Sequence, residues 1–141
     1  MTTPMKSVVI GNPHSDWWKL SRDGVSRKEE IIAISGELHA GFFSAVTPMC
    51  IPPATLQTFA SELESLDRTL SGRATLQNAN CQTEVSWVLS ALPLGHIESS
   101  GCYTINGNSL TFSFRTDQTQ LAPLLRWVKE LLVAYDNSDD D

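Results

Sequence analysis

The hydrophobic pattern of this chain changes its period twice, and this change most constrains the fold. Apolar residues first alternate with polar ones, then recur every three or four residues, and the same change repeats in the second half. The pattern predicts the order strands, helix, strands, helix. Since each element has one apolar face to bury, we expect an α+β fold in two layers, a mainly antiparallel sheet with two amphipathic helices packed on one face.

Both helices are predicted from their apolar faces and their ends. The first starts at Pro53, which suits a first helical turn, and ends before Ser71-Gly72. The second starts between Thr119 and Ala122, because Pro123 is tolerated only near a helix start, and it extends to residue 135. The apolar positions are Leu56, Phe59, Leu63, Leu66 and Leu70 in the first helix, and Leu121, Leu124, Leu125, Val128, Leu131, Leu132 and Tyr135 in the second.

The strands are predicted from alternation and turn chemistry. Before the first helix we expect strands over residues 5–10, 16–20, 30–38 and 39–46, with a turn at Arg22-Asp23-Gly24. After it we expect two hairpins, one turning at Asn78-Ala79-Asn80 and one at Asn106-Gly107-Asn108. Gly101 falls inside a strand, which indicates a bulge or close packing.

Length and charge indicate one domain followed by a short tail. The 141 residues suit one hydrophobic core, which we place in residues 1–135. Four of the sixteen acidic residues are Asp136, Asp139, Asp140 and Asp141, so we expect residues 136–141 to be a disordered acidic tail. The remaining twelve acidic residues face ten Lys and Arg, and the domain is nearly neutral.

Several classes of function lack their sequence signatures. The Lys and Arg residues are scattered, adjacent only at Arg27-Lys28, so we expect no nucleic-acid partner. No apolar run reaches the roughly eighteen residues of a membrane helix or the length of a signal peptide, so we expect a cytoplasmic protein without a membrane partner. Three cysteines far apart in sequence predict reduced thiols.

Catalytic chemistry is not indicated either. His14, His39 and His96 stand alone, without a spaced nucleophile or a second metal ligand on the same element. The glycines do not cluster into a phosphate-binding loop. We therefore predict no catalytic residue, no metal site and no cofactor, and a protein that is not an enzyme.

Two adjacent tryptophans suggest binding instead. In an extended strand the side chains of Trp17 and Trp18 point to opposite faces, so at most one enters the core. The other is either covered by the N-terminal segment or is an aromatic anchor for a protein partner. Phe42 and Phe43 pose the same question.

Three sequence runs resemble a known family. They are Leu66-Asp67-Arg68-Thr69-Leu70-Ser71-Gly72-Arg73-Ala74, Gly95-His96-Ile97, and Phe112-Ser113-Phe114-Arg115-Thr116-Asp117-Gln118-Thr119. Together they resemble the small bacterial proteins related to the WapI-type immunity proteins. The likeness extends over residues 36–132, and Thr116-Asp117-Gln118-Thr119 is its most specific part.

The resemblance implies a non-enzymatic protein that binds a cognate toxin domain and blocks its active site. It adds Arg115, Asp117 and Gln118 to Trp17 and Trp18 as candidate partner-binding residues. Asp117 also suits a helix cap, with Gln120 reaching back as in a capping box, so the role of this run as cap or as contact stays open. A strongly acidic surface, which would suit a basic nuclease toxin, is absent from the domain.

Two alternatives remain open. One is a small ligand-binding or hydrolytic domain with a cleft between sheet and helices, where His39, His96 or Glu98 would converge. The other is a structural subunit that assembles with itself through a sheet edge, burying Trp17 or Trp18 in a homo-oligomer. Partner identity, oligomeric state and strand order are not encoded in these patterns.

Overall fold

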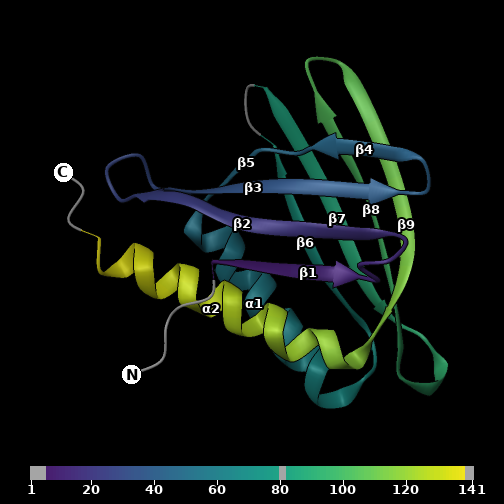
Figure 1. Cartoon of the computed structure of the whole chain (residues 1–141). Coiled ribbons are helices and arrows are strands. Elements are labelled where there is room, and N and C mark those ends of the chain that lie inside the picture. The colour runs from purple at the N-terminus through teal and green to yellow at the C-terminus, as the bar shows by residue number, and fades with distance from the viewer. Residues whose placement is uncertain (1–5, 80–81, 139–141) are drawn as a thin grey trace.

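The computed structural model describes residues 6–79 and 82–138. Within these ranges the α+β class and the predicted order of elements are confirmed (Figure 1). The first strands are β1 (Ser7–Gly11), β2 (Trp17–Ser26), β3 (Ile31–Ala40), β4 (Phe43–Val46) and β5 (Met49–Ile51), followed by helix α1 (Pro53–Thr69). The second set is β6 (Arg73–Ala79), β7 (Thr83–Ala91), β8 (His96–Ile105) and β9 (Asn108–Asp117), followed by α2 (Leu121–Asp136). Short 3-10 turns, η1 (Pro93–Gly95) and η2 (Gln118–Gln120), precede β8 and α2.

The strands form two antiparallel sheets, whereas the sequence pattern predicts one. Sheet A has the order β1-β2-β3-β4, with β5 pairing to the same strand β3, and sheet B has the order β6-β7-β8-β9. In Figure 1 the strands of sheet A run across those of sheet B. Alternation shows that a strand has one buried face but does not say what covers that face, and here each sheet covers the other.

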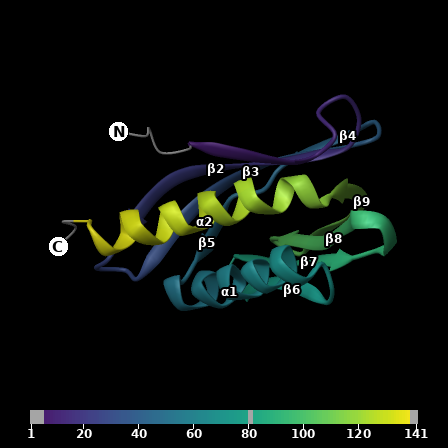
Figure 2. The same ribbon diagram turned by 90° about the horizontal axis from the view of Figure 1, so that it is seen from below.

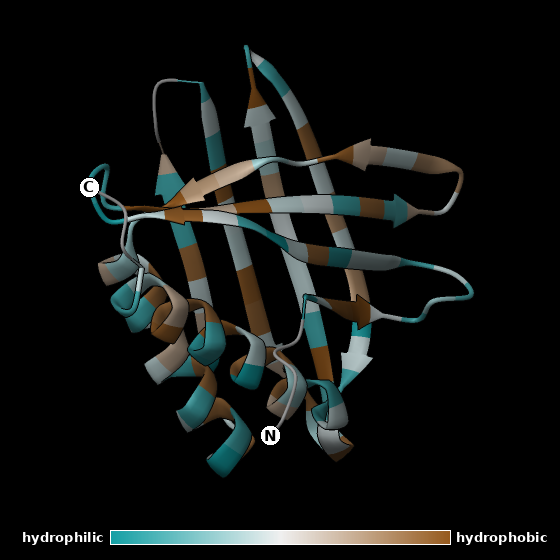
Figure 3. Ribbon diagram, turned by 60° about the vertical axis from the view of Figure 1, so that its left-hand side comes forward, coloured by the Kyte–Doolittle hydropathy of each residue, from teal (hydrophilic) through white to brown (hydrophobic). Residues whose placement is uncertain are grey.

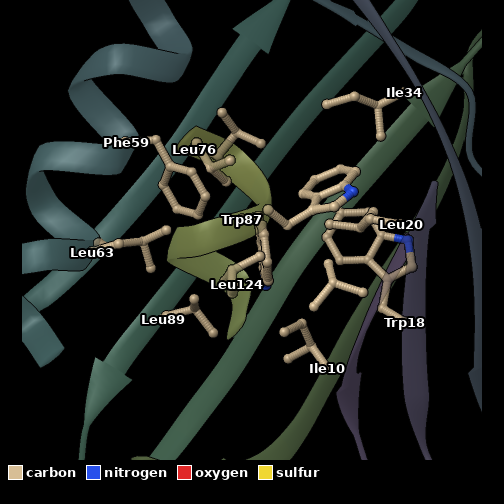
Figure 4. Close-up of a cluster of buried hydrophobic side chains, with 14 of the residues drawn as sticks. Ile10, Trp18, Leu20, Ile34, Phe59, Leu63, Leu76, Trp87, Leu89 and Leu124 are labelled. Atoms are coloured by element: carbon tan, nitrogen blue, oxygen red, sulfur yellow. The ribbon is translucent and has the colours of Figure 1, made fainter. Parts of the chain in front are cut away.

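Aromatic side chains fill the space between the sheets. Trp18 of sheet A and Trp87 of sheet B are both fully buried, and their rings meet edge to face (Figure 4). Phe112 of β9 lies 5.1 Å from Trp18, centroid to centroid, and Phe59 of α1 lies 5.4 Å from Trp87. The core is therefore shared by both sheets and by the first helix.

The two helices lie against each other and close one side of the space between the sheets (Figure 2). Helix α2 runs beside β1 and α1 beside β6. Most of the predicted apolar positions are buried: Leu56, Phe59, Leu63 and Leu66 in α1, and Leu121, Leu124, Val128 and Leu131 in α2. Within residues 6–79 and 82–138, no helix combines the length and apolar character that crossing a bilayer requires.

Helix boundaries agree with the sequence signals. Helix α1 begins at Pro53 and is closed by Leu70, whose left-handed backbone lets its N–H bond to the Leu66 carbonyl. Helix α2 begins at Leu121, inside the predicted window, and ends at Asp136. Of the predicted acidic tail, residues 139–141 lie outside the described residues, as does the first residue of the predicted strand 5–10.

One predicted turn is wrong and another is confirmed. Strand β2 continues through Arg22-Asp23-Gly24, with a register shift between Arg22 and Gly24, and ends only at Ser26. Residues with turn chemistry also suit a β-bulge, which is why the pattern misled. Asn106 and Gly107 join β8 to β9 with positive φ angles of 51° and 81°, as the sequence predicts. The turn predicted at 78–80 is wrong for its first two residues, because Asn78 and Ala79 belong to β6 and pair with Val85 and Glu84, and residue 80 lies outside the described residues.

The outer faces of both sheets are free of the helices. Figure 3 shows hydrophobic and hydrophilic residues alternating along the strands, as sheets with one buried face require. Short hydroxyl side chains dominate the outer face of sheet B, at Thr75, Ser86, Ser90, Ser100, Thr104, Ser109, Thr111 and Ser113.

Candidate partner-binding surface

Two loops at one end of sheet A are tied together. The β1–β2 loop, residues 12–16, and the β3–β4 turn, Gly41 and Phe42, lie at the end where β1 and β3 finish (Figure 1). The Gly41 N–H donates to Asp16 Oδ1 at 2.7 Å, which fixes the turn against the loop. We call residues 12–16 and 41–43 the loop surface.

The β1–β2 loop is also braced internally. The Asn12 N–H donates to the Asp16 carbonyl at 2.8 Å, and the Ser15 N–H donates to the Asn12 carbonyl at 2.9 Å. The Asn12 side chain accepts from the His14 N–H at 2.9 Å. These bonds satisfy the backbone within the loop and hold its shape without help from a partner.

The β3–β4 turn presents two phenylalanines to solvent. Phe42 is 106% exposed and Phe43 is 74% exposed. Gly41, with a φ of 63°, allows the chain to reverse before them. Two neighbouring exposed aromatic rings on an anchored turn make this turn a candidate for contact with a protein partner.

The two tryptophans separate as strand geometry requires. Trp18 is fully buried and donates its indole N–H to Thr47 Oγ1 at 3.0 Å, so it is a core residue and is not accessible to a partner. Trp17 is half-buried on the outer face of sheet A and stacks on His39, with centroids 4.1 Å apart and an interplanar angle of 18°. Of the pair, only Trp17 remains a candidate contact residue.

A hollow of about 440 Å³ lies beside the β1–β2 loop. It brings Arg115 and Asp117, two of the predicted contact residues, next to the loop. Trp17 adjoins it through its strand partner Gly11. Its lining residues come from both sheets and from η2: Gly11, Asn12, Pro13, His96, Arg115, Thr116, Asp117 and Gln120.

Asp117 caps the turn that leads into α2. Its carboxylate accepts hydrogen bonds from the Thr119 hydroxyl and from the Thr119 N–H, the latter at 2.8 Å. These bonds, the hydroxyl first, hold the pKa of Asp117 below its ordinary value, and His96 across the strand pair adds a smaller effect in the same direction. Gln118 is exposed, and its side chain lies close to the backbone of Gly95.

Gln120 joins the two ends of the chain, rather than reaching back to its own helix. Its Oε1 accepts from the Gly11 N–H at 2.8 Å, and its Nε2 donates to the Gly11 carbonyl at 2.8 Å. The Thr116 hydroxyl also donates to Oε1. The local pattern predicts a capping box here, and it cannot reveal a contact across 109 positions.

The histidines and acids predicted for a catalytic cleft do not line one cavity. His96 lines the hollow, whereas His39 stacks on Trp17 and Glu98 pairs in register with Arg115 on the outer face of sheet B. In the part of the chain that the structure describes, no group of three or more His, Cys, Asp or Glu side chains is placed to hold a metal ion.

Comparison with solved structures shows a shared fold at low identity. A guide RNA-binding protein complex bound to guide RNA superposes with a TM-score of 0.58 at 11% identity, covering 97% of this chain and 94% of the other. MRP1/MRP2 of Trypanosoma bruciei gives 0.57 at 10% identity, covering 98% and 88%. WHY3 of Arabidopsis thaliana gives 0.57 at 6% identity, covering 96% and 93%.

The family comparison is more specific. No curated protein sequence matches the chain. The model of the immunity protein WapI-like family matches residues 10–136, which includes the runs that carry the resemblance and extends it to most of the first three strands. The chain therefore belongs to the immunity protein WapI-like family.

Proposed function

We propose that this protein neutralises a toxin domain by binding it through the loop surface and the adjoining hollow. The observation that carries the proposal is the exposed Phe42, held on a turn that Asp16 anchors. Family membership supports an immunity role. The role is stoichiometric binding in the bacterial cytoplasm, and it requires no catalytic residue.

The composition of this surface suits a protein partner. Phe42 and Phe43 are aromatic residues of a kind that is enriched at protein interfaces. Arg115 and Asp117 line the adjoining hollow and offer charged contacts there. The hydrogen bonds within the loop reduce the conformational entropy that binding must remove, so contact energy is not spent on ordering the surface.

A role in binding RNA is less well supported, although one structural neighbour is a guide RNA-binding complex. Among the described residues, the outward positions of sheet B carry two cations, Arg73 and Arg115, among short hydroxyl side chains. A surface for single strands needs aromatic rings for stacking and a track of positive charge. The shared fold alone does not transfer that function.

The test takes as its partner a toxin-like domain whose gene is found directly next to this one in the bacterial genome. We expect its expression to kill a bacterial host and co-expression of this chain to restore growth. We expect Phe42→Ala to weaken binding of the purified toxin domain at least tenfold, a loss of about 1.4 kcal/mol, as for an interface hot spot. The matched control is Val133→Ala, an exposed apolar residue on α2.

The comparison of the two variants requires that the wild type restores growth and that both variants fold normally by circular dichroism. Failure of the wild type to bind the toxin domain or to restore growth would contradict the proposed function. Equal affinities for the Phe42→Ala and Val133→Ala variants would instead show that the loop surface is not part of the interface with the toxin domain.

A further inference from the structure

Strand β4 forms an open edge of sheet A. At the opposite edge, Gln120 bonds to both backbone groups of Gly11, and α2 runs beside the strand. In sheet B, the first strand β6 is held by α1, where Glu62 accepts from the Thr75 N–H at 2.8 Å. Edge strands left open are templates for pairing with another chain, and proteins normally cover or block them.

The segment next to β4 is not open in the same way. Strand β5 follows β4 along the same side of β3. The Cys50 carbonyl in β5 accepts from the Asn78 side chain at 2.9 Å, and the Pro48 carbonyl accepts from the Tyr103 hydroxyl. Side chains of sheet B thus already donate to the carbonyl groups on either side of Met49. The open part of this edge is therefore confined to β4.

The register shows which backbone groups of β4 are available. Thr47, directly after β4, exchanges two backbone hydrogen bonds with Gly36 of β3, at 2.8 and 3.1 Å. Hydrogen-bonded pairs alternate along an antiparallel ladder, so Ala45 also faces β3, and Ser44 and Val46 direct their N–H and C=O groups away from it. The edge therefore offers two donors and two acceptors in strand geometry.

The edge is short, but its sequence lacks two common forms of protection, charged residues and proline. Residues 40–46 read Ala-Gly-Phe-Phe-Ser-Ala-Val, without a charge or a proline. Val46 is 73% exposed, and Ser44 is also exposed. Natural edge strands avoid pairing through charges, prolines or bulges, so an apolar edge left bare is suited to accept a strand.

We propose that the toxin domain adds an extended strand to β4, pairing with Ser44 and Val46 through four backbone hydrogen bonds. This inference rests on the proposed function and specifies how the partner docks. Strand β4 starts at Phe43, where the loop surface ends, so one partner can contact the exposed rings and continue along the edge. Backbone pairing supplies affinity, and the aromatic residues supply specificity.

The length of the edge favours a toxin strand over a second copy of this chain. Two copies paired through β4 share only the four residues from Phe43 to Val46. A toxin strand is not limited to that length and can continue onto the exposed rings of the loop surface. Charge does not decide between the two, because Glu37, in register with Val46, also faces Lys19 and lies 3.6 Å from His39 Nε2.

The experiment removes one outward donor without disturbing the sheet. In Val46→Pro the lost N–H is one that points away from β3, so the ladder to β3 keeps its bonds. Val46→Ala is the matched control, because it shortens the side chain and keeps the N–H. We expect the purified toxin domain to bind Val46→Pro at least tenfold more weakly than Val46→Ala.

Amide hydrogen exchange by NMR on the wild-type complex gives a second readout that does not depend on a variant folding. We expect the Ser44 and Val46 amides to exchange rapidly in the free protein and slowly in the complex, while the Ala45 amide is protected in both.

The possible results separate the two proposals. If the wild type binds the toxin domain but the Ser44 and Val46 amides stay unprotected, or if both Val46 variants bind equally, strand addition is wrong and the proposed function stands. If the wild type does not bind, the proposed function itself fails. Protection of the same amides in the free chain, with a dimer in sedimentation, would make the occupant a second copy and overturn the inference.

Discussion

The indole of Trp18 meets the indole of Trp87 edge to face, with ring centroids 4.8 Å apart, and this contact joins the inner faces of the two sheets. Each ring also satisfies its N–H inside the core. Trp18 donates to Thr47 Oγ1 at 3.0 Å, and Trp87 donates to Ser99 Oγ at 2.8 Å. Among residues 6–79 and 82–138, the buried polar residues are Thr47 and Ser99, and both are explained as acceptors for these indoles.

Removal of this contact should destabilise the whole protein. We expect Trp18→Ala to lower the free energy of unfolding by about 3–5 kcal/mol, because a large buried ring is lost and Thr47 loses its donor. Urea unfolding followed by far-ultraviolet circular dichroism measures the effect. Trp17→Ala is the control, since Trp17 is half-buried on the outer face, and we expect a clearly smaller loss. Equal losses for the two variants would show that the sheets do not share this core.

Gly101 should not tolerate a side chain. A Cβ at this position would lie 2.7 Å from both the Phe112 ring and the Ser86 carbonyl. We expect Gly101→Ala to cost about 1–3 kcal/mol through overpacking. Gly24→Ala is the control, because nothing lies within 4 Å of a Cβ there, and its thermal midpoint should stay near that of the wild type. An unchanged thermal midpoint for Gly101→Ala would mean that the strands next to Gly101 can separate without cost.

The Gln120 side chain should stabilise the fold from a distance. We expect Gln120→Ala to cost about 1–3 kcal/mol, because Gly11 loses the partners of its N–H and its carbonyl in a half-buried place. Gln118→Ala removes the same side chain from an exposed position two residues earlier and should have little effect. Chemical denaturation of both variants measures the two free energies of unfolding. A similar stability for the two would contradict the role assigned to Gln120.

The Asp117 cap should contribute a pH-dependent part of the stability. Its pKa is lowered in the folded state by the Thr119 hydrogen bonds, so the folded protein binds the proton less readily than the unfolded chain. Its stabilisation is therefore present above the ordinary value of 3.8 and is lost as the pH falls through the lowered value.

Urea unfolding of the wild type and of Asp117→Asn, at a series of pH values from neutral to acid, tests this. We expect the wild type to be the more stable at neutral pH and the difference to shrink in the acid range, since Asn does not titrate. A difference that is independent of pH would show that the carboxylate charge does not matter to the cap.

The elements of this fold could be predicted, but the way the sheets pair could not. Pro53, the spacing of leucines and the Asn106-Gly107 turn are local signals, and the structure confirms what each of them predicts. Strand β5 has no such signal, because three residues, Met49 to Ile51, are too few to show a period. The division into two sheets depends on Trp18 meeting Trp87, a contact between distant parts of the chain that alternation does not encode.

The candidate surface could also be predicted only in part, because local patterns do not encode contacts between distant residues. Strand geometry predicted that Trp17 and Trp18 part to opposite faces, and helix-cap chemistry predicted the role of Asp117. The bond from Gly41 to Asp16 spans 25 positions and has no sequence signature, so the sequence could raise Phe42 as a question but not place it on an anchored turn. Hydrogen bonds between loops depend on the finished fold.

The double hydrogen bond between Gln120 and Gly11 has a consequence for synthesis. The ribosome adds Gln120 only 109 positions after Gly11, so β1 receives this anchor late in synthesis, and a chain truncated before residue 120 lacks it.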